Sequence, residues 1–76
     1  MPTVLRVRGF KFFFFSHEGN EPVHIHVRKG DGAAKFWLDP VSLEYADGFK
    51  KQELRAIVRI LERHERELIR AWNEFE

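Results

Sequence analysis

Two histidines, His24 and His26, are the residues of this chain whose type and spacing most directly predict chemistry. They alternate with aliphatic residues in the stretch VHIHV, residues 23–27, and this alternation is typical of a half-buried β-strand. Side chains two positions apart in a strand point to the same face of the sheet. The sequence therefore predicts two imidazole rings side by side on one face.

Acid–base catalysis is the first use that such a pair suggests. Cleavage of RNA needs a base for the 2′-hydroxyl, an acid for the leaving oxygen and cations near the developing charge. In the predicted strand pairing Asp39 lies opposite His24 and can orient it as the base, while His26 serves as the acid. Arg28 and Lys35 supply the cations. The alternative is that both histidines are packing residues without a catalytic role.

Zinc binding is the second use that the pair suggests. Two histidines on one face of a strand can share a zinc ion when a third ligand is near, and Asp39 or His17 is available. Arg28 and Lys35 repel a dication, however, and the chain has no cysteine to add a thiolate ligand. The sequence therefore assigns no metal and no cofactor.

The elements that must position the histidines are strands up to about Gly48. Short apolar runs of period 2 alternate there with Gly, Asn, Asp and Pro. Arg8-Gly9 and Asp31-Gly32 are the predicted corners of two consecutive hairpins, and residues 17–22 form a loop. The predicted strands are Val4 to Val7, Phe10 to Ser16, Val23 to Lys29 and Ala33 to Leu38, with Val41 to Tyr45 as a short fifth.

From Phe49 onward, apolar residues recur at steps of three and four, which predicts an amphipathic helix. Lys50 is the predicted N-cap, because Phe49 and Leu54 then form a hydrophobic staple and Glu53 takes the N3 position of a capping box. A single helix of about 24 residues is about 36 Å long, so its last turns overhang the sheet or contact a partner. The fold class is α+β: an antiparallel sheet of four to five strands with one long C-terminal helix packed on one face.

The two hairpins divide the side chains of the sheet into two sets. Counting outward from the corners gives a uniformly apolar helix-facing set: Leu5, Phe10, Phe12, Ile25, Val27, Phe36 and Leu38. The opposite side, here named the far face, holds both histidines, with Val4 opposite Phe13 and His26 opposite Trp37. Both histidines are expected to be exposed there, so replacing either by alanine should be nearly neutral for folding.

Cations and aromatic rings surround the histidines on the far face. They are Arg6, Lys11, Phe13, Phe15, Arg28, Lys35 and Trp37. This mixture is typical of single-strand RNA binding, in which bases stack on rings and phosphates meet cations. A solvated surface, or a surface that a partner protein covers, is the alternative. Four consecutive phenylalanines, residues 12–15, favour a covered face, because one strand then shows rings on both sides.

Length and composition predict one small domain. The chain has 76 residues, of which 43% are hydrophobic, so it can form a core; residues 1–45 are assigned to the sheet and 49–75 to the helix. Its net charge of +1 identifies no partner. Without cysteine, a signal-peptide pattern or an apolar run of membrane-spanning length, a cytoplasmic protein with no membrane contact is expected.

Three stretches of the chain together resemble a known family. They are GFKFFFFSHEGNEPVHIHV, then GDGAAKFWLDPVSL, then a helix ending in AWNEF. They are similar to the bacterial "domain of unknown function 4160" family, most specifically in the Pro-x-His-x-His strand and in Trp72. The resemblance implies no established activity. It does imply a prokaryotic protein with a small cognate protein encoded nearby, in an arrangement like a toxin–antitoxin pair.

These observations lead to two hypotheses about function. The favoured one is a toxin-like, RNA-directed protein that uses the far face. The alternative is a non-catalytic module whose far face binds the cognate protein or a second copy of the chain as a homodimer.

Overall fold

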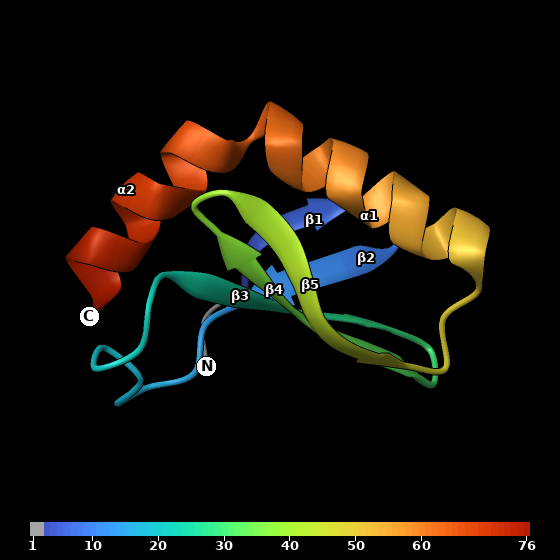
Figure 1. The fold of residues 1–76 in the computed structure, drawn as a ribbon, viewed down its shortest axis with the longest axis horizontal. Coiled ribbons are helices and arrows are strands. Elements are labelled where there is room, and N and C mark those ends of the chain that lie inside the picture. Colours follow the sequence, from blue (N-terminus) through green and yellow to red (C-terminus); the bar gives the residue numbers. More distant parts are fainter. Residues whose placement is uncertain (1–2) are drawn as a thin grey trace.

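The computed structural model describes residues 3–76 and confirms the α+β class (Figure 1). Met1 and Pro2, with which the predicted sheet region begins, lie outside the described residues. Five antiparallel strands follow one another in the order β1-β2-β3-β4-β5, and two helices cover one face of the sheet (Figure 1). The strands are β1 (Thr3–Val7), β2 (Phe10–Phe13), β3 (His24–Lys29), β4 (Gly32–Leu38) and β5 (Val41–Asp47). The helices are α1 (Lys51–Arg63) and α2 (Glu65–Phe75).

The first hairpin turns at Arg8 and Gly9, as predicted. Both residues have positive φ, 54° and 86°, which is the conformation of a type I′ turn. The predicted pairs hold through Leu5 and Phe12. Beyond them the strands shift register, so that Thr3 rather than Val4 lies opposite Phe13. The predicted Val4–Phe13 pair is therefore wrong, because an irregularity in the ladder interrupts the simple count.

The second hairpin turns one residue earlier than predicted. Gly30 and Asp31 occupy the corner and Lys29 lies opposite Gly32, because Gly30 takes the positive φ of 57° that the turn requires. Every residue of β3 is thereby displaced by two positions along β4. A displacement of two keeps each side chain on its predicted face. It changes the neighbours: His24 lies opposite Trp37 instead of Asp39, and His26 lies opposite Lys35 instead of Trp37.

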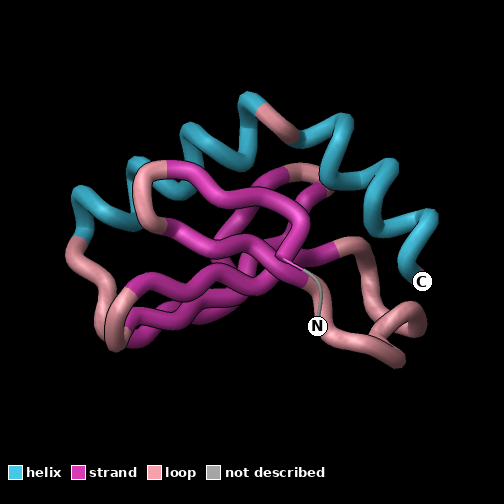
Figure 2. Tube along the Cα trace, turned by 180° about the vertical axis from the view of Figure 1, so that it is seen from behind, coloured by secondary structure: helices cyan, strands magenta, loops and turns pink. Residues whose placement is uncertain are grey.

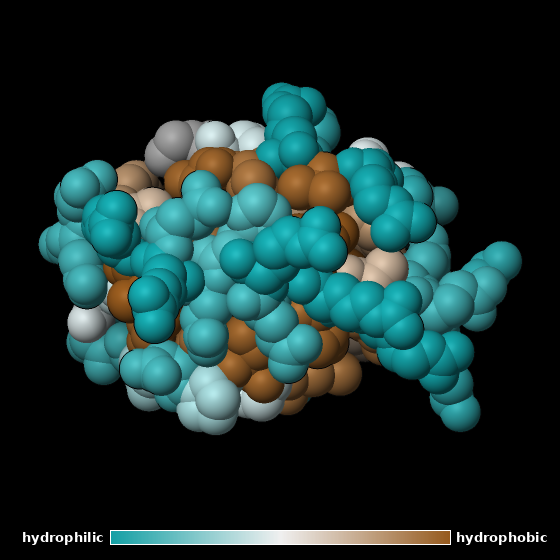
Figure 3. Space-filling view, turned by 90° about the horizontal axis from the view of Figure 1, so that it is seen from above, coloured by the Kyte–Doolittle hydropathy of each residue, from teal (hydrophilic) through white to brown (hydrophobic). Residues whose placement is uncertain are grey.

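The apolar face of the sheet and the stripe of the helices form the predicted core. Phe12, Ile25, Val27, Phe36 and Leu38 are fully buried there. They pack in one cluster with Ile57, Leu61, Leu68 and Trp72 of the helix layer. The outer surface of this layer is mainly hydrophilic, with hydrophobic patches between its polar side chains (Figure 3).

The helix layer is bent, and the prediction of one long helix is wrong. The helix layer changes direction between α1 and α2 (Figures 1 and 2). His64 separates the two helices, which have 13 and 11 residues. A straight helix of about 36 Å would exceed the longest dimension of the molecule, 30 Å. The bend keeps α2 on the sheet, and Trp72 is buried with 6% of its surface exposed instead of overhanging.

The start of α1 follows the predicted capping pattern in part. Lys50 is the N-cap, and its backbone N–H donates to Glu53 Oε1 at 2.8 Å. Because a lysine side chain has no acceptor, only this half of a capping box can form. Just before the helix, the ring of Phe49 lies over Gly32, where an added Cβ would come within 2.5 Å of it. Only glycine therefore fits at the start of β4.

Candidate functional site

His24 and His26 are buried, and the prediction that they are exposed is wrong. Their exposed fractions are 0% and 6%. Residues 14–23, here named the covering loop, connect β2 to β3 and carry side chains that close over both rings. The Phe15 ring lies 4.3 Å from the His26 ring, and Trp72 of α2 lies 4.8 Å from the His24 ring. The period of the strand predicts the face of a side chain correctly but does not show what covers that face.

One carboxylate of the covering loop links the two histidines. Glu18 Oε1 lies 2.7 Å from His24 Nε2 and 3.1 Å from His26 Nε2. On its other side, His24 Nδ1 lies 2.9 Å from the carbonyl oxygen of Pro22 and donates to it. The three side chains Glu18, His24 and His26 are here named the His–Glu cluster.

Burial and hydrogen bonding act differently on the pKa values within this cluster. Burial raises the pKa of the Glu18 carboxyl, but the hydrogen bonds from His24 and His26 outweigh it, so the pKa lies below its ordinary value. For His26, burial lowers the pKa, and the hydrogen bond to Glu18 offsets only part of this effect. At neutral pH an ionised Glu18 therefore accepts a hydrogen bond from a neutral His26.

The cluster can also be described as a set of metal ligands. One nitrogen from each histidine and one Glu18 oxygen all lie within 4.8 Å of one another. Glu18 was absent from the sequence-based candidates, which offered His17 or Asp39 as the third ligand. Asp39 is exposed in the turn after β4 and does not lie opposite His24. The catalytic role assigned to His24, His26 and Asp39 stays a prediction, and it loses the pairing on which it was built.

Three of the seven predicted binding residues form a continuous row of cations. Arg6 lies opposite Lys11 and Lys11 lies opposite Arg28, on three neighbouring strands, and all three are exposed. Within residues 3–76, no carboxylate forms an ion pair with any of them. Arg6, Lys11 and Arg28 are here named the cation row. At about 4.8 Å between strands, it extends over about 10 Å.

The other four predicted binding residues already contact neighbours inside the protein. Lys35 Nζ donates to Glu21 Oε1 at 2.7 Å, and this hydrogen bond raises the pKa of Lys35. Trp37 Nε1 donates to Glu44 Oε1 at 3.0 Å. Phe13 and Phe15 pack on the ring of His26, and Phe13 is only 7% exposed. The predicted aromatic stacking platform is therefore mostly covered, while the cation row is open.

Comparison with known proteins identifies the family of the chain. Residues 9–73 match the model of "Domain of unknown function (DUF4160)", so the chain belongs to that family. Searches of curated proteins and of solved structures each found no match. Neither helix in the described part of the chain is long and apolar enough to cross a membrane.

Proposed function

We propose that the protein binds single-stranded RNA through the cation row, as the RNA-directed member of a toxin–antitoxin-type pair. The observation that carries the RNA part is the unpaired row Arg6, Lys11 and Arg28 on adjacent strands. Like charges directly opposite one another destabilise a sheet. An anionic ligand such as a phosphate backbone removes this repulsion on binding. The pairing with a cognate protein rests on the family resemblance.

Salt dependence of RNA binding tests the cation row. For a single strand, each phosphate contact contributes about 0.7 to the slope of log K against log salt. Lys11→Ala should therefore weaken binding of a fluorescent RNA oligonucleotide and reduce the slope by about 0.7. Fluorescence anisotropy at several salt concentrations measures both quantities.

Arg66→Ala is the matched control, because it removes one positive charge from an exposed position in the helix layer. It should leave the slope unchanged. If both variants have the same effect, overall charge and not the row determines binding. RNA that remains intact during these measurements would limit the proposal to binding.

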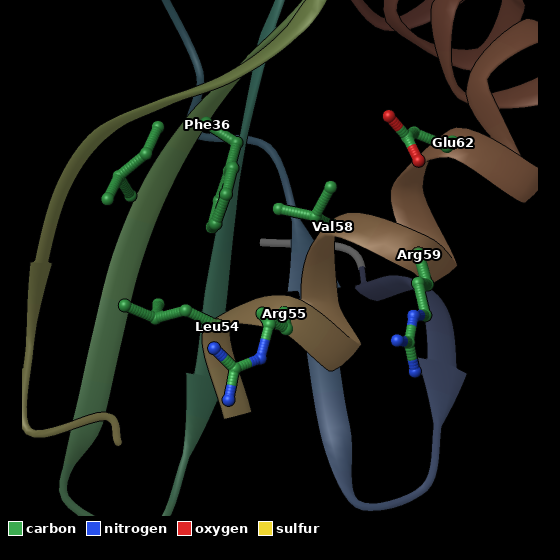
Figure 4. Close-up of a pocket in the computed structure, with 7 residues that line it drawn as sticks. Phe36, Leu54, Arg55, Val58, Arg59 and Glu62 are labelled. Atoms are coloured by element: carbon green, nitrogen blue, oxygen red, sulfur yellow. The ribbon is translucent and has the colours of Figure 1, made fainter. Parts of the chain in front are cut away.

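A second candidate function, binding of the cognate protein without RNA chemistry, is supported by strand β5. This strand is an edge of the sheet, and it carries the exposed large hydrophobic residues Leu43 (47%) and Tyr45 (52%). Leu43 also lines a groove of about 360 Å³ between β5 and α1, together with Phe36, Leu54 and Val58 (Figure 4). Arg55, Arg59 and Glu62 form its polar rim. An edge strand beside an apolar groove suits a partner that adds a strand.

Leu43→Ala tests this second candidate. Losing a central apolar anchor typically weakens an interface by about 1–2 kcal/mol, or roughly tenfold. Affinity for the small protein encoded next to the chain should fall accordingly, as measured by titration calorimetry, while Arg66→Ala has no effect. Unchanged affinity would place the partner elsewhere. A dimer of the chain alone that Leu43→Ala dissociates would identify a second copy as the occupant.

A further inference from the structure

We propose that Glu18, His24 and His26 bind one divalent transition-metal cation of the Zn²⁺ class. The histidines come from positions of β3 that share a face, and the carboxylate comes from the covering loop, so their three ligand atoms converge within 4.8 Å. Two imidazole nitrogens and one carboxylate oxygen are a donor set that zinc and its neighbours accept. This inference is independent of the RNA proposal.

The orientation of His24 is the observation that favours a cation. The carbonyl of Pro22 only accepts hydrogen bonds, so the nitrogen that faces it, Nδ1, holds a proton. The other ring nitrogen, Nε2, faces Glu18 Oε1 at 2.7 Å and is the nitrogen left to bind a cation.

The same hydrogen bond is a known feature of metal-binding histidines. A ligating imidazole commonly donates its second N–H to a backbone carbonyl, which fixes the ring and directs the other nitrogen at the metal. His24 is held in this way before any metal arrives.

The cluster must adjust to hold the ion, because the two histidine nitrogens, which lie within 4.8 Å of each other, would have to come closer together. Ligand bonds of about 2.0–2.1 Å in tetrahedral geometry place two ligand atoms about 3.3 Å apart. The contact of Glu18 with His26, at 3.1 Å, is already close to this value, and its contact with His24 would lengthen by about half an ångström. Glu18 lies on a loop with 24% of its side chain exposed, so it can move outward and leave a position for water.

Of the two cations that were expected to repel a metal ion, Arg28 and Lys35, one is offset by a carboxylate of the covering loop. Lys35 was expected to repel a dication, but Glu21 lies 2.7 Å from its ammonium group and offsets the charge. A second contact, 3.9 Å from Glu21 Oε1 to His24 Nδ1, places this carboxylate beside the cluster as well. Arg28, the other cation that was expected to repel a dication, forms no ion pair among residues 3–76, and its side chain is exposed in the cation row.

A zinc titration of the chelator-treated full chain tests the site. Calorimetry should show one zinc ion per chain. The melting temperature should rise by about 10 °C or more when free zinc exceeds the dissociation constant a hundredfold. Glu18→Gln should weaken zinc binding about 100-fold, the upper end of the range for groups that support a metal site. Circular dichroism checks that this variant is folded.

Glu74→Gln is the matched control, because it removes the same charge from an exposed position of α2 that takes no part in the cluster. Its zinc affinity should stay within about threefold of the original chain. If both glutamine variants weaken binding equally, or if zinc leaves the melting temperature unchanged, the proposal is wrong. Cobalt(II) gives a measurement that needs no variant. Its visible absorption should intensify up to one equivalent and disappear when zinc is added, and an unchanged spectrum would overturn the proposal.

Discussion

The histidines of β3 show how a small domain can bury polar rings. A buried polar group destabilises the fold unless it finds a hydrogen-bond partner. Glu18 serves both Nε2 atoms and the Pro22 carbonyl serves His24 Nδ1. Among the described residues, every buried side-chain nitrogen and oxygen has a partner. The cluster therefore fastens the covering loop to the sheet, whether or not a metal ion is bound.

Replacing one of these rings tests this structural role. His26→Ala removes a buried ring that stacks on Phe13 and takes a hydrogen-bond donor from Glu18. Its free energy of unfolding should fall by about 2–4 kcal/mol in urea denaturation, as for other large-to-small changes in a core. Arg66→Ala, at an exposed position of α2, should change it by less than about 0.5 kcal/mol. Equal effects would mean that the His26 ring is accessible to water.

The sequence predicts the histidine pair but not the glutamate that joins it. Alternation in VHIHV is a local property, so it correctly places both rings on one face. Glu18 reaches them through the fold of a ten-residue loop, which no periodic pattern describes. The available signal was an acidic residue in a turn-rich segment six residues before His24. That signal is weak, because surface loops commonly contain glutamate.

The helix bend is the element that periodicity predicted least well. The apolar stripe runs from Leu54 to Leu61 and resumes at Leu68, and His64 and Glu65 occupy the intervening stripe positions. No proline or glycine lies there, so the usual signals of a helix break are absent. The available indication of a break was that His64 and Glu65, which are polar, occupy positions that would face the core in a continuous helix. Packing of Leu68 and Trp72 on a small sheet then requires the change of direction.

Each helix contributes to stability through its buried stripe. Leu61 is completely buried between α1 and the sheet, so Leu61→Ala should lower the free energy of unfolding by about 2–5 kcal/mol. Leu43→Ala makes the same chemical change at a residue that is 47% exposed. It should lower that free energy by no more than about 1 kcal/mol. Urea denaturation measures both, and similar values would show that α1 packs on the sheet through a different stripe.

At the scale of the whole molecule, the proposed activities occupy separate surfaces. The cation row crosses β1, β2 and β3 on the far face, whereas the groove lies between β5 and α1 on the helix side. The His–Glu cluster lies behind the covering loop. The effect of a substitution in one region can therefore be measured without altering the other two, because no residue chosen for these tests lies in more than one region. Composition alone could not show this arrangement, because a net charge of +1 hides the segregation of the cations.

The simple strand order has a consequence for the growing polypeptide. Every strand pairs with the one made just before it, so β1 to β5 can zip together successively as they leave the ribosome. The helices that cover Phe12, Ile25 and Phe36 are synthesised last. Until the helices are made, the apolar face of the sheet is exposed to water. Nascent chains that stop before α1 should therefore be the ones most prone to aggregate or to require a chaperone.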